Sequence, residues 1–295
     1  MTNLIELDTR GYEYKKWKIG NSIPLRSGIC NIKVFPNDTF PCHWHDGVEI
    51  ISVVDGEIEH TVNGERYIMR KGDVMFVNSG SIHGIRITDA GHGYYYAISF
   101  LTGFLAPESN GIISEKYFGD IMSSDNLPLL FISSDDEKSQ KITQICTEVS
   151  NLQAESDGCH EIHIKAELLR LWGILYGEAI KKKPCGSSDI AVQRIKNAVK
   201  YIEDNYQSKI GVDDIALACK TSRSELYRSF TRVMRRPPID YVIDLKIRKS
   251  IELLEAGMSV TEVAMATGFS DSSYYTKMFK RYIGCTPKEY VKNKR

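Results

Sequence analysis

The sequence has no long hydrophobic run and no local concentration of cysteine. A membrane helix needs about 18 or more apolar residues in succession, and no such run occurs in the 295 residues. The start of the chain, Met1-Thr-Asn-Leu-Ile-Glu-Leu-Asp8, lacks the basic and apolar blocks of a secretory signal. The seven cysteines are scattered, odd in number and never spaced Cys-x-x-Cys. These absences exclude a membrane protein and a disulfide-rich secreted protein, and they predict a protein of the reducing cytoplasm.

The sequence also has no net charge, because 38 basic residues balance 38 acidic ones. The balance hides an asymmetry along the chain. Residues 190–295 hold 20 Lys and Arg against 12 Asp and Glu, whereas residues 1–189 hold 18 against 26. All seven histidines lie at or before position 163. A basic C-terminal third that follows an acidic, histidine-containing N-terminal part predicts two domains with different partners.

Residues 28–101 predict a β-domain. Short segments such as 49–54 and 58–62 are apolar throughout or alternate with a period of two. Asn63-Gly64 predicts a two-residue hairpin, because a type I′ turn needs a positive φ at both central positions. Many short strands at close spacing are typical of a sandwich or barrel and not of a parallel sheet.

From about residue 135 the apolar period becomes helical. Asp135-Asp136-Glu137 places acid at a helix N-terminus, where it is stabilising. A second helix, roughly 160–182, has a wide apolar stripe that includes Leu168 and Leu171. The stripe suits either the domain core or a surface that pairs two protomers. Residues 181–188 then supply a basic helix end, a proline and a short polar linker.

One pattern occurs twice after this linker. Each copy has a small residue suited to a close helix crossing, a tight turn four residues later, a polar cap and an apolar i, i+4 pair. The copies are Ile215-Ala216-x3-Lys220-x-Ser222 with Leu226 and Phe230, and Val263-Ala264-x3-Gly268-x-Ser270 with Tyr275 and Phe279. This is the helix-turn-helix plan, in which the second helix presents its polar face to the major groove of DNA.

The second copy resembles the AraC/XylS family of transcription regulators. The resemblance is carried by Val263-Ala-x3-Gly-Phe-Ser-Asp-x-Ser-Tyr-Tyr-x-Lys-x-Phe-Lys280 and by the tail Gly284-Cys-Thr-Pro-Lys-Glu-Tyr290. It implies two recognition helices in successive major grooves, joined by a connecting helix at about Pro238–Glu255. The first copy departs from the family pattern at Lys220, where a left-handed turn costs a side chain on the order of 1 kcal/mol. It also departs at residues 235–238 and at Lys246, where the family usually has Arg.

Candidate DNA contacts follow from the direction of each side chain. Inward-facing Leu226, Phe230, Tyr275 and Phe279 leave the polar residues between them facing outward. Arg228 and Lys277 hold equivalent places and predict contacts with guanine O6 and N7. Residues at the helix ends predict phosphate contacts, which position the protein without reading sequence. The predicted base-facing residues are Arg223, Ser224, Tyr227, Arg228, Ser272, Ser273, Thr276 and Lys277, and the predicted phosphate-facing residues are Arg232, Lys280 and Arg281.

Two motifs nearer the N-terminus resemble those of cupins. Phe40-Pro-Cys-His43-Trp-His45-x3-Glu49-x6-Gly56 resembles the first motif, and Gly72-Asp-x4-Asn78-x-Gly80-x2-His83 resembles the second, with Asn78 in the place of a proline. His43 and His45 share one strand face because side chains alternate. Glu49 opens the next strand, and His83 is expected to arrive from across the barrel.

Three hypotheses for these four residues stay open. Three imidazoles and a carboxylate suit Mn, Fe, Ni or Zn. The same groups suit an organic effector, which AraC-type regulators often bind in a barrel of this kind, and they also suit a purely structural cluster. The remaining histidines, His60, His92, His160 and His163, are predicted to lie on the surface or in the core.

The two resemblances together imply an α+β protein. We predict a cupin-like effector-binding barrel over residues 1–105, a helical dimerisation segment over 106–183, a linker over 184–190, and an AraC-type double helix-turn-helix over 191–293. The implied function is a sequence-specific DNA-binding transcription regulator, an activator, controlled by a small-molecule effector such as a carbohydrate. Expected partners are a double-stranded DNA operator, a second copy of the chain in a homodimer, and RNA polymerase, but no membrane.

Two other functions agree with part of the sequence. A metal-dependent cupin sensor differs only in what occupies the barrel. A cupin enzyme fused to a DNA-binding domain is set aside, because no enzyme activity of the barrel requires a duplicated helix-turn-helix.

Overall fold

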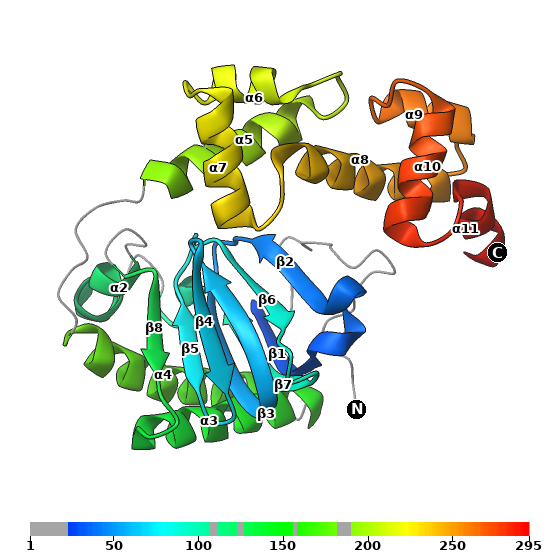
Figure 1. Cartoon of the computed structure of the whole chain (residues 1–295). Helices are drawn as coiled ribbons and strands as arrows, with labels where there is room; N and C mark the ends of the chain where they lie inside the picture. Colours follow the sequence, from blue (N-terminus) through cyan, green and yellow to red (C-terminus); the bar gives the residue numbers. More distant parts are fainter. Residues whose placement is uncertain (1–22, 107–110, 123–126, 156–157, 182–189, 295) are drawn as a thin grey trace. The chain divides into compact units, whose positions relative to one another are not determined.

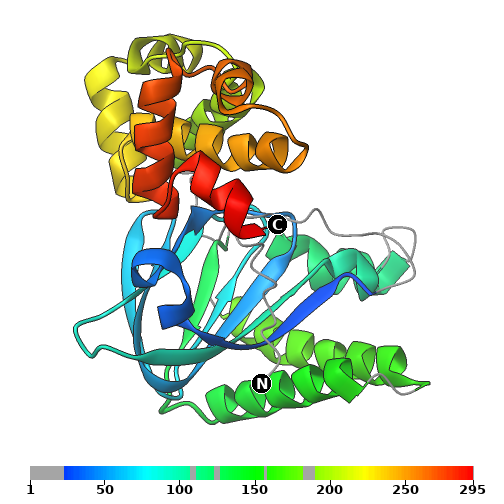
Figure 2. The same cartoon turned by 90° about the vertical axis from the view of Figure 1, so that its right-hand side faces the viewer.

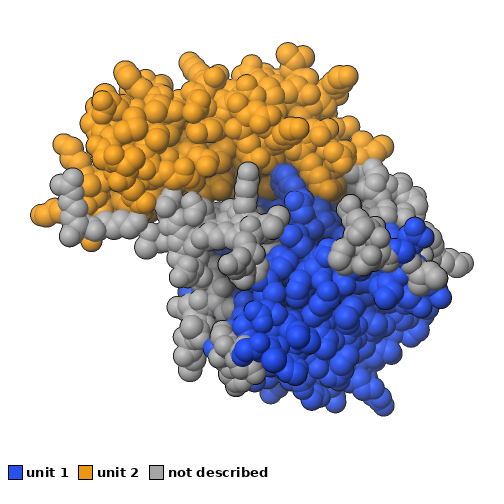
Figure 3. Space-filling model, turned by 180° about the vertical axis from the view of Figure 1, so that it is seen from behind, with its two compact units in different colours: residues 1–6, 14–189 blue, residues 7–13, 190–295 orange. Residues whose placement is uncertain are grey.

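The computed structural model describes residues 23–106, 111–122, 127–155, 158–181 and 190–294. The chain divides into two compact units between Asp189 and Ile190, coloured separately in Figure 3. The expected linker, residues 184–190, lies outside the described residues apart from Ile190. No helix in the described part of the chain combines the length and apolar character that a membrane span requires.

The first unit is built around one long strand, β3 (Figures 1 and 2). One sheet has the order β1-β7-β3-β5-β8, while β4 and β6 pair with the second half of β3 and β2 pairs with β6. All of these pairs are antiparallel. The strands are β1 (Leu25–Asn31), β2 (Thr39–His43), β3 (Val48–Val62), β4 (Glu65–Arg70), β5 (Val74–Val77), β6 (His83–Ile87), β7 (Gly93–Phe100) and β8 (Leu129–Ile132).

The predicted hairpin joins β3 to β4. Asn63 has φ 48° and Gly64 has φ 89°, the two positive values that a type I′ turn needs. This prediction is confirmed.

Strand β8 corrects the sequence analysis, which predicted residues 106–183 as helical. Leu129–Ile132 pairs with β5, in a register that places Leu129 opposite Val77 and Ile132 opposite Val74. A run of four apolar residues has no period that separates strand from helix, so only its contact with the sheet decides between them. The other short elements of this unit are η1 (Ile32–Val34), η2 (Pro36–Asp38), η3 (Thr102–Phe104), α1 (Gly111–Ile113), η4 (Ser114–Gly119) and α2 (Asp120–Met122).

Two long helices, α3 (Glu137–Glu155) and α4 (His160–Ala179), lie side by side against the first sheet (Figure 2). Their apolar faces share one core with Val48 and Ile50 of β3. Leu168 and Leu171 are fully buried in this core. The hypothesis that these two leucines pair protomers is therefore wrong, because the sheet already covers them.

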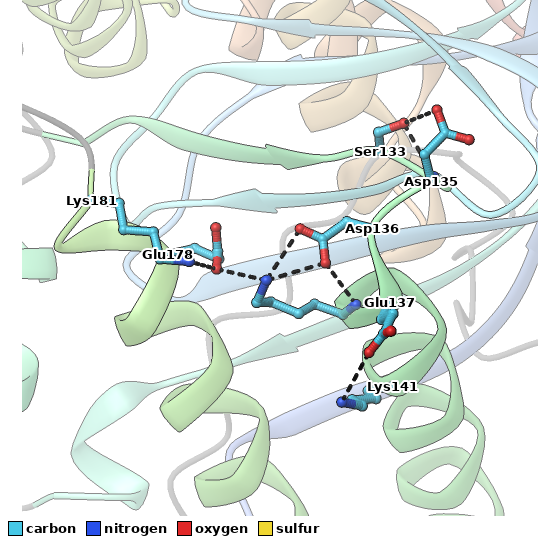
Figure 4. Close-up of polar contacts among 8 residues, drawn as sticks. Ser133, Asp135, Asp136, Glu137, Lys141, Glu178 and Lys181 are labelled. Carbon is cyan, nitrogen blue, oxygen red and sulfur yellow. Dashed lines mark hydrogen bonds and ion pairs between the residues drawn. The ribbon is translucent and has the colours of Figure 1, made fainter.

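An ion-pair network fixes the start of α3 to the end of α4 (Figure 4). The backbone N–H of Lys138 donates to Asp136 Oδ1 at 2.9 Å, which satisfies one free N–H group of the first turn. Lys138 Nζ lies 3.2 Å from Asp136 Oδ1 and 3.2 Å from Glu178 Oε1. The acidic helix start that the sequence predicted thus caps α3, and it also holds Lys138, which forms the ion pair with Glu178 of α4.

The second unit is entirely helical and contains the two predicted helix-turn-helix units. Helices α6 (Val212–Ala218) and α7 (Arg223–Met234) form the first, and α9 (Val260–Ala266) and α10 (Ser272–Ile283) form the second. The connecting helix α8 (Pro238–Glu255) has the predicted bounds, while α5 (Ile190–Asn205) and α11 (Pro287–Lys294) flank the pair. The four anchoring side chains predicted to face inward, Leu226, Phe230, Tyr275 and Phe279, are all fully buried.

The two turns differ as the sequence predicted. Gly268 has φ 71° in the second unit, and Lys220 adopts φ 50° at the equivalent place in the first. The described cysteines are all free thiols, while Cys185 lies outside the described residues.

Candidate functional site

The first recognition helix, α7, presents a polar face to solvent. Ser222 caps it, its Oγ accepting a hydrogen bond from the N–H of Glu225 at 3.2 Å. The predicted contacts Arg223, Ser224, Tyr227, Arg228 and Arg232 are all exposed, and the first four line one surface hollow. The structure therefore brings these side chains together on one helix face.

Two of the arginines on α7 already have acidic partners. Arg223 Nη1 lies 3.1 Å from Asp213 Oδ2 of α6, and Arg228 forms an ion pair with Glu225 one turn away. Neither carboxylate is among the DNA contacts that the sequence predicted. The i, i+3 spacing of Glu225 and Arg228 was the available signal, because residues at this spacing are neighbours on a helix surface.

The second recognition helix, α10, begins after Asp271, whose Oδ1 accepts a hydrogen bond from the N–H of Tyr274 at 2.7 Å. Ser273, Lys277, Lys280 and Arg281 are exposed, as predicted. Ser272 and Thr276 are half-buried, and Thr276 Oγ1 donates to the carbonyl of Ser272 at 2.8 Å. These two residues are therefore the least available of the predicted contacts on α10.

In the first unit, the four cupin-motif residues meet at one place. His43 ends β2, His45 follows in the next turn, Glu49 is the second residue of β3, and His83 begins β6. One ligand atom from each lies within 4.8 Å of the others. His83 does not come from across the barrel as predicted, because β6 neighbours β2 and His83 pairs with His43 in the strand register.

Backbone carbonyls fix the orientation of all three imidazoles. The Nδ1 atoms of His43, His45 and His83 lie 2.8, 2.8 and 2.9 Å from the carbonyl oxygens of Pro41, Gly47 and Ser81, respectively. A carbonyl oxygen can only accept a hydrogen bond, so each Nδ1 carries the proton. With Nδ1 held in this way, Nε2 is the nitrogen that each ring offers to the cluster, which is the arrangement found around metal-ligating histidines.

The carboxylate of Glu49 lies next to the Nε2 atoms of His45 and His83. Its Oε2 is 2.8 Å from His83 Nε2 and 3.1 Å from His45 Nε2. Burial raises the pKa of Glu49, but the hydrogen bonds and charges of His45 and His83 outweigh it and hold that pKa well below its usual value. Burial, with the neighbouring charges of His83 and His45, holds the pKa of His43 well below its usual value, so this ring is neutral. A carboxylate oxygen 2.8 Å from a ring nitrogen needs either a proton between the two atoms or a metal ion that both bind.

The donor set fits a divalent transition metal. Nitrogen and oxygen ligands lie about 2.0–2.2 Å from such a metal, so opposite ligands are about 4.2 Å apart. The observed limit of 4.8 Å exceeds that spacing by about 0.6 Å, so the side chains would move slightly closer together on binding one ion. Three imidazoles and one carboxylate are ligands that Mn, Fe, Ni and Zn all accept.

His60 is a residue whose role the sequence did not identify. It lies on β3, is fully buried, and neither ring nitrogen has a hydrogen-bond partner among the described residues. Its ring centroid is 6.1 Å from that of His83, and burial lowers its pKa to about 3. Buried polar groups are almost always satisfied, so a neutral imidazole with two unpaired nitrogens next to the cluster indicates that another polar group binds there.

Asn78, which replaces the cupin proline, has a structural role. Its buried side-chain amide donates to the carbonyl of Leu127 at 3.0 Å and to that of Ile121. The asparagine thus connects the turn before β6 to the segment that precedes β8.

Comparisons with known proteins agree with both sites. Residues 215–293 match a family model described as a helix-turn-helix domain, and residues 32–98 match one described as a cupin domain. The chain is 30% identical over 257 residues to an uncharacterized HTH-type transcriptional regulator, YdeC, of Bacillus subtilis, and the match covers 87% of each chain. It is 23% identical to the HTH-type transcriptional activator RhaS of Klebsiella pneumoniae, over 90% of this chain and 93% of that one.

Similarity also extends to a sugar-operon regulator and to a solved structure. The melibiose operon regulatory protein of Escherichia coli is 24% identical over 85% of this chain and 83% of its own. The crystal structure of ToxT from Vibrio cholerae aligns at 14% identity and a TM-score of 0.42, covering 90% of this chain and 96% of that one. The duplicated helix-turn-helix, the cupin motifs and the similarity to YdeC over 87% of each chain lead to one conclusion: the chain is a DNA-binding transcription regulator and belongs to the AraC/XylS family.

Proposed function

We propose that this regulator is a transcriptional activator, not an enzyme, and that a divalent transition metal held in its cupin unit controls its DNA binding. The observation that carries the metal proposal is the orientation of His43, His45 and His83, whose Nδ1 atoms all face backbone carbonyls. Activation and an RNA polymerase partner are supported by relatives named as activators. A DNA partner implies action in the cytoplasm.

On the DNA side, α7 and α10 are the proposed reading helices. Arg228 and Lys277 are the proposed base readers, since both are exposed and occupy equivalent places in the two copies. Arg232, Lys280 and Arg281 are the proposed phosphate contacts. The remaining outward residues of both helices, Arg223, Ser224, Tyr227, Ser272, Ser273 and Thr276, complete the proposed surface.

On the cupin side, His43, His45, Glu49 and His83 would hold the metal. A bound metal would supply a Lewis-acid centre for an oxygen-containing ligand. The protein's own contribution is to fix the three imidazole tautomers and to keep a carboxylate charged at the centre of the cluster. Binding there would join β2, β3 and β6, and so would couple occupancy to the stability of the first unit.

Thermal unfolding of the full chain tests this proposal. After treatment with chelator and dialysis, adding Mn, Fe, Ni or Zn should raise the Tm of the wild type, because a ligand that binds only the folded state stabilises it. His83→Ala should abolish the increase. His92→Ala is the matched control, because His92 is a surface histidine outside the cluster. No increase with any of the four metals, or an equal increase in His83→Ala, would contradict the proposal.

An organic effector in the same interior is the second candidate, and His60 favours it. A neutral imidazole offers one donor and one acceptor, which match a hydroxyl group. A carbohydrate is the proposed class, in line with a relative that is named for the melibiose operon. His60→Leu should then leave the metal-dependent Tm increase intact but abolish the transcriptional response to small carbohydrates. A response to the same sugars that is unchanged in His60→Leu would overturn this candidate.

We also propose that the chain forms a homodimer through the outward face of α4. Ile162, Leu169 and Ile180 are 71%, 41% and 63% exposed. Together with exposed Gly173 they follow each other at spacings of seven, four and seven residues, which places them on one side of the helix. The opposite side holds the buried leucines, so dimerisation and core packing use different faces.

Sedimentation equilibrium tests the dimer interface. Leu169→Glu with Ile162→Lys should give a folded monomer where the wild type is a dimer, because each change places a charge in an apolar contact. Arg170→Glu is the control, since Arg170 lies on the same helix but pairs with Glu167. If the double variant stays dimeric, the α4 interface is wrong.

A further inference from the structure

Three of the equivalent positions at which the two recognition helices differ form one polar group in the first helix. Counting from the caps Ser222 and Asp271, Glu225 corresponds to Tyr274, Arg228 to Lys277, and Ser229 to Met278. In α10, Tyr274 is an exposed aromatic residue and Met278 is a buried apolar one. In α7 the equivalent residues, Glu225 and Ser229, are both polar and form a hydrogen bond with each other. The first copy therefore has a polar pair beside its candidate base reader, where the second copy has an aromatic and an apolar residue.

The Glu225 carboxylate is anchored to the scaffold through one of its oxygens. Oε1 accepts a hydrogen bond from Ser229 Oγ at 2.8 Å and from Arg194 Nη1 of α5 at 3.3 Å. These contacts tie the side chain both to its own helix and to the helix that supports it. Hydrogen bonds from Ser229 and Arg228 lower the pKa of Glu225, so the carboxylate stays charged.

The other carboxylate oxygen of Glu225, Oε2, accepts a hydrogen bond from Arg228 Nη2. The Arg228 side chain nevertheless remains 79% exposed. A guanidinium has five N–H donors in a rigid plane, so fixing one terminal nitrogen orients the remaining donors. Lys277, the counterpart on α10, has no ion pair among the described residues. The first recognition helix thus carries a braced arginine, and the second an unbraced lysine.

We infer that Glu225 is a positioning residue that sets the base specificity of the first helix-turn-helix by bracing Arg228. This deepens the established DNA-binding function and rests on the proposed contact of α7 with bases. A braced guanidinium loses less conformational entropy when it meets guanine O6 and N7 in a bidentate contact. The carboxylate also repels phosphates, so Arg228 gains less from non-specific DNA than an unpaired arginine would.

In vitro selection from a random pool of DNA duplexes tests this inference with the full chain and its variants. The wild type should select a guanine at one position, by roughly 10-fold over the next base, as a bidentate contact allows. Arg228→Ala should lose that preference. Glu225→Gln should weaken it at the same position only. The same variant should bind random-sequence DNA more tightly, with a salt slope steeper by up to about 0.9, the value for one more phosphate neutralised. Glu225→Asp should restore part of the preference.

Two controls keep the test decisive. Glu252→Gln removes the same charge from exposed Glu252 on α8 and should leave every base preference unchanged. Melting curves establish that Glu225→Gln is folded. If Arg228→Ala changes one position and Glu225→Gln changes none, the bracing role is overturned while base reading by α7 stands. If Arg228→Ala changes no position, base reading by Arg228 fails, and the role of Glu225 fails with it.

Discussion

Lys246 Nζ donates a hydrogen bond to the carbonyl oxygen of Gly268 at 2.5 Å, which ties the connecting helix α8 to the turn of the second helix-turn-helix. The same nitrogen donates to the carbonyl of Ser208, which follows α5, at 3.1 Å. Lys246 is only 6% exposed, and burial lowers its pKa. One buried ammonium therefore links three segments of the DNA-binding unit.

Replacing this lysine should loosen the unit. Lys246→Met keeps most of the side-chain length but leaves two carbonyl oxygens without their charged donor, and hydrogen bonds to charged groups contribute about 1.5–3 kcal/mol. The denaturation midpoint of the DNA-binding unit should fall accordingly. Lys246→Arg, the residue usual in the family, is the control and should retain most of the stability.

The two turns should respond in opposite ways to matched changes. Gly268→Ala should destabilise the unit by about 2 kcal/mol or more, because an L-residue is strained at positive φ and a Cβ atom would overlap the carbonyl oxygen of Gln207. Lys220→Gly should stabilise it, since a lysine there holds φ 50° at a cost of about 1 kcal/mol. Urea denaturation of each variant measures both effects. A stabilising Gly268→Ala would contradict the structure of this turn.

On the second recognition helix, base and phosphate contacts should separate by their salt dependence. Lys277→Ala should relax the preference at one base pair and cost about 1–3 kcal/mol on the selected sequence. Lys280→Ala should weaken binding to all sequences alike and reduce the salt slope by about one. For the wild type, about six neutralised phosphates correspond to a slope near −5. A salt-independent affinity would rule out the basic surface as the binding face.

The link between α3 and α4 should make the first unit sensitive to acid. The pKa of Asp136 is lowered by hydrogen bonds from the N–H and the ammonium of Lys138, and that of Glu178 by those from Lys181 and then Lys138. A carboxyl whose pKa is lower in the folded state stabilises the fold above its unfolded pKa, and this stabilisation disappears as the pH falls through the folded value. Stability should therefore decline as the pH falls below the ordinary values of 4.5 and 3.8. In Lys138→Gln the decline should be shallower, and an unchanged pH profile in that variant would show that the link contributes nothing.

The sequence predicted most of the fold because the patterns that carry it are local. The Asn63-Gly64 turn, the left-handed Lys220 and the inward pairs Leu226–Phe230 and Tyr275–Phe279 each depend on residues a few positions apart. The sequence did not predict secondary structure that depends on tertiary contacts. Leu129–Ile132 is a strand only because β5 pairs with it.

The candidate sites show the same limit. The motif residues His43, His45, Glu49 and His83 meet as the two cupin patterns implied. No pattern revealed that the nitrogens of His60 are unpaired, because that depends on what surrounds the ring in three dimensions. The partner of Arg228 was visible as an i, i+3 pair, but its anchoring through Arg194 joins residues 31 positions apart.

The central proposal is that the four-residue cluster holds a metal, and the metal content of the purified protein tests it most directly. The protein is prepared without a histidine tag or chelator and analysed for Mn, Fe, Ni and Zn. The account predicts a total close to one metal ion per chain, and a clear loss in His43→Ala and in His83→Ala, since each removes a neutral imidazole ligand. Fewer than about 0.1 metal ions per chain, not restored by adding any of the four metals, would contradict it.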